Sequence, residues 1–451
     1  MPTTIDKVEK WSFSYFILKK YVDWAFHFYF RTTVKGFDKL PKDSSLIFAP
    51  NHQNALMDAL GILCVKTWQP VFLARADIFK QPAIRKILLF LKIMPIYRIR
   101  DGYENLQNND KTFSKTIDVL KNQNGLTVMP EGNHGELKKL RPLKKGIARI
   151  ALQAMEAAPE LDIEIVPVGL DYTNYIKVRS KLHIRFGEPF SVKPYVRIYE
   201  ENQGKAYKLL MKKIETVLKP EMINIEDKEY YSAHKVLIDS FANGLLRKNA
   251  IPINHANIFN KQKKIIDAID NFSANNNDDF LLLAADALEY KMLLDKQKLD
   301  PTVFPMTKKQ QFNLFPATIG LAVLSPLFLA AFINILPPVA FAKLISRKIK
   351  DKQFISSVRF AIALILAPLF LIIQLTVFAL ITKSAAYTLA YTVAYPLCFY
   401  IVFIWKNWTN TAAHRLNELS LKVFRKKKSR RMYELYDSIF NQLQHLLKSQ
   451  R

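Results

Sequence analysis

Two patterns of apolar positions divide this chain. Between residues 32 and 215, short apolar runs alternate with segments whose apolar residues recur every three or four positions. The runs predict β-strands and the periodic segments predict helices. The strand candidates are 46–49, 70–74, 94–97, 126–129, 163–170 and 182–186, with helical patterns between them, as at 82–91 and 110–121. This alternation predicts an α/β domain, a sheet core covered by helices.

The pattern after residue 315 is almost wholly apolar. Residues 316–345 carry Lys343 as their only charge, and this segment is interrupted by Pro326, Pro337 and Pro338. The double proline predicts a bend, so we expect the segment to enter and leave the membrane on one side. Residues 360–381 and 385–405 are each long and apolar enough to cross a bilayer, and the short gap between them predicts a helical hairpin.

The remaining segments complete a five-part organisation. Residues 11–30 are dense in aromatics but contain Lys19, Lys20 and Asp23. They predict an amphipathic helix lying in the membrane interface, and a buried helix of the soluble domain is the alternative. Polar helical patterns between 225 and 300 predict a connector packed on the α/β domain. The expected parts are 1–31, interfacial helix; 32–220, α/β domain; 221–312, helical connector; 313–408, transmembrane region; and 409–451, basic amphipathic tail.

Charge narrows the choice of partners. The chain has 66 Lys and Arg against 39 Asp and Glu, a net charge of +27, which calls for an anionic partner. The long apolar runs, with 31 Phe and 19 Tyr, favour anionic membrane lipid over nucleic acid. The basic segments 346–353 and 425–431 are expected on the cytoplasmic side of the membrane. The α/β domain is expected on the same face, as part of an integral membrane protein.

Several common classes of site are excluded. With only Cys64 and Cys398, the chain has no disulfide framework and no CxxC metal site. The sequence contains no GxSxG, HExxH, P-loop or GxGxxG pattern, which removes the common hydrolase, zinc protease and nucleotide-binding interpretations.

The candidate chemistry lies just after the first apolar run. Pro50 ends that run, and His52 and Asp58 follow with five residues between them. A neutral imidazole is a good acceptor for a hydroxyl proton only if its tautomer is fixed, and a carboxylate on the far ring nitrogen fixes it. A polar helix start is the alternative interpretation of the same residues.

Three later segments add to this pair: PIYR at 95–98, MPEGN at 129–133 and IVPVGLDY at 165–172. In order and approximate spacing, the four motifs resemble those of the glycerolipid acyltransferase family, over residues 30 to 215. That family includes the lysophosphatidic acid and glycerol-3-phosphate acyltransferases. The flanking sequences VKGFDKLPKDSSLIFAPNH and RPLKKGIARIAL are similar too.

The resemblance implies a reaction and its residues. A fatty acyl group would pass from acyl-CoA or acyl carrier protein to a hydroxyl of glycerol 3-phosphate or its 1-acyl derivative, in phospholipid biosynthesis. His52 would be the base and Asp58 would hold its tautomer, without a metal or cofactor. Arg98 matches the Arg of the second motif and is expected to bind the acceptor phosphate, with Arg100 as a second contact.

The third motif departs from the family pattern. It reads Glu131-Gly132-Asn133-His134 where the family usually has Glu-Gly-Thr-Arg, and the family's usual His-to-Asp spacing is four residues rather than five. Glu131, Gly132 and Asn133 are expected to bind the acceptor, and His134 is a candidate donor to phosphate in place of the missing Arg. Two alternatives stay open: an acyltransferase for another lysolipid acceptor, and a catalytically silent lipid-binding membrane scaffold.

Overall fold

The computed structural model describes residues 5–97, 108–301, 305, 313–424 and 426–449. They form two compact units. The first contains Met1–Met222 together with Ala340–Leu366, and the second contains Ile223–Val339 together with Ala367–Arg451. Each unit is described by itself below.

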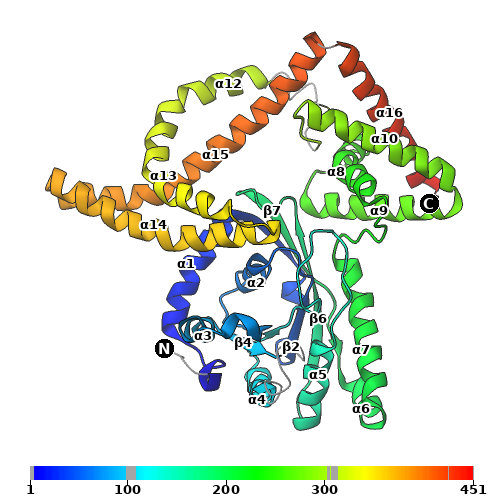
Figure 1. Cartoon of the computed structure of the whole chain (residues 1–451), viewed down its shortest axis with the longest axis vertical. Helices are drawn as coiled ribbons and strands as arrows, with labels where there is room; N and C mark the ends of the chain where they lie inside the picture. Colours follow the sequence, from blue (N-terminus) through cyan, green and yellow to red (C-terminus); the bar gives the residue numbers. More distant parts are fainter. Residues whose placement is uncertain (1–4, 98–107, 302–304, 306–312, 425, 450–451) are drawn as a thin grey trace. The chain divides into compact units, whose positions relative to one another are not determined.

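The first unit is built on one mixed sheet of eight strands in the order β1-β7-β6-β2-β5-β3-β4, with β8 paired to β6 (Figure 1). The strands are β1 Phe30–Lys35, β2 Ser45–Pro50, β3 Val71–Arg75, β4 Ile93–Ile96, β5 Leu126–Thr127, β6 Ile163–Tyr172, β7 Ser180–Phe186 and β8 Phe190–Ser191. Strand β2 runs parallel to both of its neighbours, β5 and β6. The predicted α/β core is therefore confirmed, and β1 and β8 are additions to the predicted strands.

Alternation along the strands sends side chains to two apolar layers. In β2, Ile47 and Ala49 belong to one core cluster and Phe48 belongs to the other. The first cluster packs against α4 Asn108–Lys121, α5 Gly146–Ala157, α6 Val196–Glu201 and α7 Gln203–Leu218. The second packs against α1 Phe13–Tyr29 and α2 Leu56–Leu63, while α3 Pro82–Phe90 precedes β4. Figure 1 shows helices on both faces of the sheet.

Helix α1 has one face in the core and one face in solvent. Its aromatic residues Tyr15, Phe26 and Tyr29 are buried, whereas Trp24 is exposed. The side chain of Lys19 is buried and forms an ion pair with Asp23 at 2.7 Å. The i,i+4 spacing on one helix face makes this pairing possible. The buried face agrees with the second interpretation, a helix of the soluble domain, and the interfacial position of the exposed face stays a prediction.

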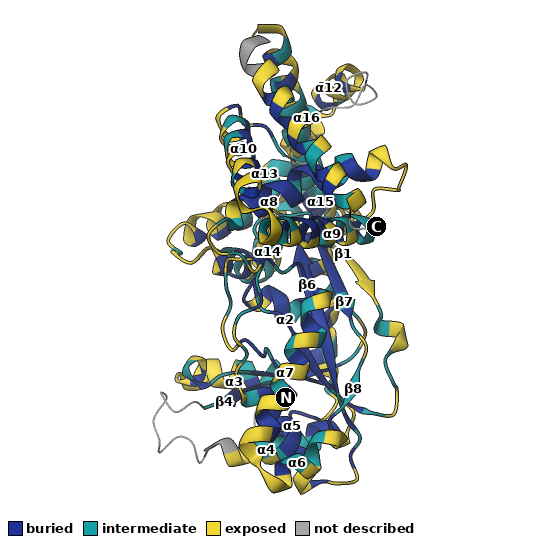
Figure 2. Cartoon of the chain, turned by 90° about the vertical axis from the view of Figure 1, so that its right-hand side faces the viewer, coloured by how far each residue is buried: buried dark blue, intermediate teal, exposed yellow. Residues whose placement is uncertain are grey.

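The second unit contains a helical bundle and the apolar helices other than residues 340–366, which belong to the first unit. Helices α8 Tyr231–Lys248, α9 His255–Asn275, α10 Asn277–Lys296 and α16 Lys426–Ser449 share one hydrophobic core. The sequence analysis treated α8–α10 as a connector packed on the α/β domain and α16 as a separate tail. The structure instead gives these four helices a core of their own, because the apolar faces of α8–α10 pack against Met432, Leu435, Ile439 and Leu443 of α16. The buried and exposed faces are distinguished in Figure 2.

Three helices in the described residues are long and apolar enough to cross a membrane: α13 Ser325–Ser346, α14 Lys352–Thr382 and α15 Ala385–Phe424. A shorter apolar helix, α12 Leu314–Val323, precedes them. The predicted hairpin matches α14 and α15, which are separated at Lys383. The helix assignment of α13 continues through Pro337 and Pro338, where a bend was expected, and the break between helices falls at Leu324 instead.

Candidate active site

The two residues of the first motif meet in the structure. His52 follows the end of β2, and Asp58 lies in the first turn of α2. The Nδ1 atom of His52 lies 2.9 Å from Oδ2 of Asp58. Asp58 is fully buried, while the His52 side chain keeps 16% of its surface exposed. The carboxylate therefore fixes the imidazole tautomer and leaves Nε2 as the proton acceptor.

The long spacing between these residues is accommodated by one unusual backbone conformation. Ala55, just before α2, has φ of 43°, in the range that L-residues other than glycine seldom adopt. Such a conformation costs on the order of 1–3 kcal/mol and is tolerated where surrounding contacts enforce it. The five intervening residues thus fold into a tight turn that still delivers Asp58 to His52.

Asp58 accepts four hydrogen bonds. Besides His52, the donors are the backbone N–H groups of Gln53 and Asn54, both at 2.7 Å, and the hydroxyl of Tyr172 at 2.8 Å. Burial, followed by the charge of Asp58, raises the pKa of Tyr172 well above its ordinary value, so its hydroxyl stays protonated and donates. Four donors around two oxygens are the environment of an ionised carboxylate.

Glu131 holds the backbone of His52. Its Oε1 accepts the His52 N–H at 2.7 Å, and its Oε2 accepts the Arg141 N–H at 3.2 Å. Burial raises the pKa of Glu131 to about 7, and the two backbone donors act in the opposite direction. Because both of its oxygens already bind backbone donors, Glu131 is placed to position His52. The sequence analysis had expected it to contact the acceptor.

The rest of the third motif forms a turn beside the base. Gly132 has φ of 66°, which favours glycine, and its N–H donates to the carbonyl of Met129 at 3.1 Å. Asn133 is exposed. The His134 ring lies edge-on to the His52 ring, with 5.6 Å between their centroids. The motif therefore brings a second imidazole next to the first.

The predicted phosphate ligands Arg98 and Arg100 lie outside the described residues. The strand that leads to them, β4, pairs with β3 as the alternation predicted. Lys138 follows the third motif in the sequence. Its side chain is buried and its Nζ donates to Oδ1 of Asp171 at 2.6 Å, because the neutralising carboxylate at the end of β6 lies within the same core.

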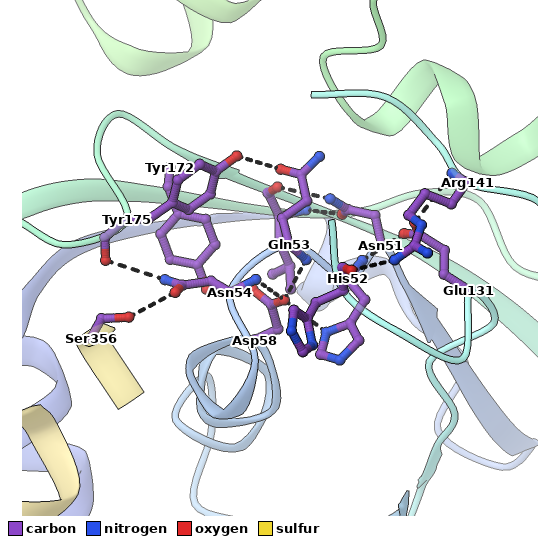
Figure 3. Close-up of polar contacts among 12 residues, drawn as sticks. Asn51, His52, Gln53, Asn54, Asp58, Glu131, Arg141, Tyr172, Tyr175 and Ser356 are labelled. Atoms are coloured by element: carbon purple, nitrogen blue, oxygen red, sulfur yellow. Dashed lines mark hydrogen bonds and ion pairs between the residues drawn. The ribbon is translucent and has the colours of Figure 1, made fainter. Parts of the chain in front are cut away.

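Several residues of the site were missed by the sequence analysis. Asn51 exchanges two hydrogen bonds with the backbone of Leu170, at 2.6 and 3.1 Å, and so fixes the end of β2 to β6. Tyr175 donates to Oε1 of Gln53 at 2.8 Å. Tyr172 ends the fourth motif, and the signal available for it was a polar hydroxyl at the end of an apolar strand. Strands β5, β2 and β6 thus deliver Glu131, His52 and Tyr172 to one edge of the sheet, where α/β sheets bind ligands (Figure 3).

Among the residues that the structure describes, no group of three or more His, Cys, Asp or Glu side chains is arranged to hold a metal ion. The arrangement offers a buried carboxylate, a partly exposed imidazole with one fixed tautomer, and a second imidazole beside it. Those groups suit proton transfer from a hydroxyl.

Comparisons with known proteins agree with this geometry. The sequence model of the Acyltransferase family matches residues 31–171. Glycerol-3-phosphate O-acyltransferase 2 of Saccharomyces cerevisiae is 33% identical over 25% of this chain and 15% of its own length. Glycerol-3-phosphate O-acyltransferase 1 of the same yeast is 25% identical over 57% of this chain and 36% of its own length. The chain therefore spans well under half of either relative.

Among solved structures, the crystal structure of the 1-acyl-sn-glycerophosphate acyltransferase PlsC from Thermotoga maritima is similar, with 22% identity and a TM-score of 0.31. The similarity covers 45% of this chain and 79% of that one. The sequence model of the Acyltransferase family thus matches the part of this chain, residues 31–171, whose first motif is assembled at the sheet edge.

Proposed function

We propose that this protein is a membrane-bound O-acyltransferase that moves a fatty acyl group from an acyl thioester to a hydroxyl of a glycerol phosphate acceptor. The observation that carries the proposal is the 2.9 Å contact between Nδ1 of His52 and Oδ2 of Asp58 at the edge of the sheet. A histidine with this tautomer and a partly exposed ring is equipped as a general base for a hydroxyl. The family match over residues 31–171 supports the same class of reaction.

The reaction follows from the positions of these groups. Nε2 of His52 accepts the acceptor's hydroxyl proton as that oxygen forms a bond to the thioester carbonyl carbon. The positive charge that develops on the imidazole faces the buried Asp58 carboxylate, which stabilises it. When the tetrahedral intermediate collapses, the carbon–sulfur bond breaks and the leaving thiolate takes the proton from His52. The products are an ester and a free thiol, and no acyl group is attached to the protein.

Glycerol 3-phosphate is the acceptor we favour, and 1-acylglycerol 3-phosphate is the second candidate. Both yeast relatives are named glycerol-3-phosphate O-acyltransferases, which supports the first choice. The five-residue spacing between His52 and Asp58 is also the variant that we associate with the glycerol-3-phosphate branch of the family. The donor on this proposal is acyl-CoA or acyl carrier protein, and the pathway is phospholipid biosynthesis.

We further propose that the acyltransferase domain lies on the cytoplasmic face of the membrane, against anionic lipid. The basic segment 346–353 precedes α14, and basic flanks favour the cytoplasmic side. An even number of crossings is supported by the bundle, because α10 before the apolar helices and α16 after them share one core. Two segments that pack together in water must leave and return on the same side.

The activity is tested by replacing the base. We expect the full-length His52→Ala protein, reconstituted in nanodiscs, to lose acyl transfer from labelled acyl-CoA by about 10²–10⁴-fold, the usual contribution of a general base. Glycerol 3-phosphate and lysophosphatidic acid are supplied separately to identify the acceptor. The control is His445→Ala, an exposed residue of α16. An unchanged rate in His52→Ala would contradict the proposed reaction and favour the alternative, a catalytically silent lipid-binding scaffold.

Sidedness is tested with single cysteines in vesicles of defined orientation, on a background from which Cys64 and Cys398 have been removed. A cysteine at Lys383, between α14 and α15, should react with an impermeant maleimide from the side opposite to one at Lys350. Labelling of both from the same side contradicts the proposed hairpin.

A further inference from the structure

A stretch that is remote in sequence packs against the acyltransferase domain. Residues 340–366, which include the start of the apolar helix α14, belong to the same compact unit as Met1–Met222. The ring centroid of Phe360 lies 6.3 Å from that of Phe26 and 5.8 Å from that of Tyr29. The Tyr21 hydroxyl donates to the carbonyl of Leu364 at 2.9 Å. The first turns of α14 are therefore part of the domain core, and their position relative to the site is fixed.

One of these turns contacts the loop that carries the base. The hydroxyl of Ser356 donates to Oδ1 of Asn54 at 2.7 Å, in a buried position (Figure 3). The Asn54 N–H in turn donates to Oδ2 of Asp58, the atom that also contacts His52. The start of α14 is thus two hydrogen bonds away from the His52–Asp58 pair.

The residue just before α14 contacts the second imidazole. Oδ2 of Asp351 lies 3.1 Å from Nε2 of His134. The Phe354 ring packs edge-on to the His134 ring at 4.6 Å, and only 11% of the His134 side chain is exposed. Gln353 faces the same ring. With its amide turned so that the oxygen accepts the Glu136 N–H at 2.7 Å, its nitrogen lies 3.0 Å from Oδ1 of Asp351 and 3.2 Å from Nε2 of His134. Residues 351–354 therefore fix the orientation of His134.

His134 occupies the position where the resemblance leads us to expect an arginine. A guanidinium carries its charge at every relevant pH, whereas an imidazole needs a neighbouring carboxylate to favour its cationic form. A cationic imidazole donates from both nitrogens. With Nε2 donating to Asp351, Nδ1 is the atom left to donate to an anion. The other charged groups around this ring are His52, at 5.6 Å between ring centroids, and Arg141, which donates to the His134 carbonyl.

We propose that Asp351 is a positioning residue that holds His134 as a cationic ligand for the acceptor's phosphate, so that the start of apolar helix α14 completes the acceptor site. The inference rests on the proposed function, since it names the group that binds the phosphate of that acceptor. A single arginine would bind the phosphate by itself. Here His134 binds it and Asp351, a carboxylate outside the family-matched segment 31–171, holds His134 in place.

The experiment measures glycerol 3-phosphate binding and turnover separately, on the full-length protein in nanodiscs. Asp351→Asn preserves size and removes the charge. We expect its Kd for glycerol 3-phosphate, measured by calorimetry, to rise about 3- to 10-fold, in keeping with a half-exposed ion pair. The KM for the acceptor should rise to match, while the KM for acyl-CoA and kcat stay within about 2-fold. Glu200→Gln, an exposed carboxylate in the same unit, is the matched control.

A double-mutant cycle separates positioning from general structural damage. In a His134→Arg background the ligand no longer needs a carboxylate partner, and in His134→Gln no cation remains to be held. Asp351→Asn should therefore change the Kd by less than about 2-fold in either background. An equal rise in Kd in all three backgrounds, or no rise in the wild-type background, overturns the inference.

The two proposals can fail independently. If wild-type protein transfers no acyl group but Asp351→Asn still weakens glycerol 3-phosphate binding through His134, the proposed reaction falls and the phosphate site stands. If wild-type protein is active and His52→Ala is not, while Asp351→Asn binds glycerol 3-phosphate normally, the reaction stands and the role of Asp351 falls.

Discussion

Replacing Asp58 by Asn removes the negative charge next to His52 and keeps the hydrogen bonds that orient the imidazole. Oδ2 of Asp58 accepts three N–H donors, from His52, Gln53 and Asn54. An amide nitrogen cannot occupy that position, because it would face three donors. The amide oxygen must therefore take the Oδ2 position, and the amide nitrogen must take the Oδ1 position opposite Tyr172, whose hydroxyl can rotate and accept. Asp58→Asn should thus keep the His52 tautomer and lose only the negative charge.

The size of that loss follows from Coulomb's law. Two unit charges about 4 Å apart interact by about 4 kcal/mol at an effective dielectric constant of about 20. That is the stabilisation which the imidazolium loses in the transition state, and 1.36 kcal/mol corresponds to a factor of ten in rate. We therefore expect kcat/KM for Asp58→Asn to fall about 10³-fold. The melting temperature should change by less than about 4 °C, because relief from burying a charge offsets the weaker hydrogen bonds.

The assay is acyl transfer from labelled acyl-CoA to glycerol 3-phosphate by full-length protein in nanodiscs, with thermal melts of the same samples. Asp38→Asn, at an exposed carboxylate, is the control. If Asp58→Asn keeps more than about a tenth of the wild-type kcat/KM with an unchanged melting temperature, the carboxylate charge does not stabilise the imidazolium and the reasoning is wrong.

Three further predictions follow from single contacts. Tyr172→Phe leaves a buried oxygen of Asp58 without its hydroxyl donor and should lower the free energy of unfolding by about 1.5–3 kcal/mol, visible as a lower melting temperature; an unchanged melt contradicts this. Burial raises the pKa of Glu131 from 4.5 to about 7, so its contribution to stability is fully present below pH 4.5 and is lost as pH rises through 7. The loss in the free energy of unfolding is about 3 kcal/mol. Between pH 5 and 8 the melting temperature of Glu131→Gln should therefore fall less than that of the wild type; parallel pH profiles contradict this. In Gly169→Ala the new Cβ would lie 1.7 Å from the Glu221 carbonyl oxygen, so we expect a loss of about 3 kcal/mol or more and poor recovery of monodisperse protein; normal recovery with a normal melt contradicts the packing at that strand.

The sequence was informative where a local pattern determines the structure. The short apolar run of Leu46, Ile47 and Phe48 identified β2, and the uncharged runs identified the hairpin of α14 and α15. His52 and Asp58 could be paired because both come from one short segment whose turn and helix start bring them together. Their partners at distant positions, such as Tyr172, carried only a weak signal.

Contacts between remote segments were the part that could not be predicted. Nothing in the local sequence around Asp351 or Ser356 indicates that these residues meet His134 and Asn54, because the pairing depends on how an apolar helix returns to the sheet domain. The same holds for α16, whose basic amphipathic pattern is equally typical of a free tail or of a helix that completes a bundle. The i,i+4 ion pair that allows Lys19 to be buried was visible in the sequence only after its burial was known.

The shared core of α8, α9, α10 and α16 has a consequence for how the chain is made. During synthesis the first three of these helices emerge long before Ile439 and Leu443, which fill the centre of that core. At about 5–20 residues per second, the ribosome needs on the order of ten seconds to reach them from the end of α10. Over that interval the apolar faces of α8–α10 lack their last partner, while the intervening helices are being synthesised and, on the proposed membrane placement, inserted. Completion of the bundle thus reports that insertion has finished, and nascent chains stopped before α16 should be preferred clients of chaperones.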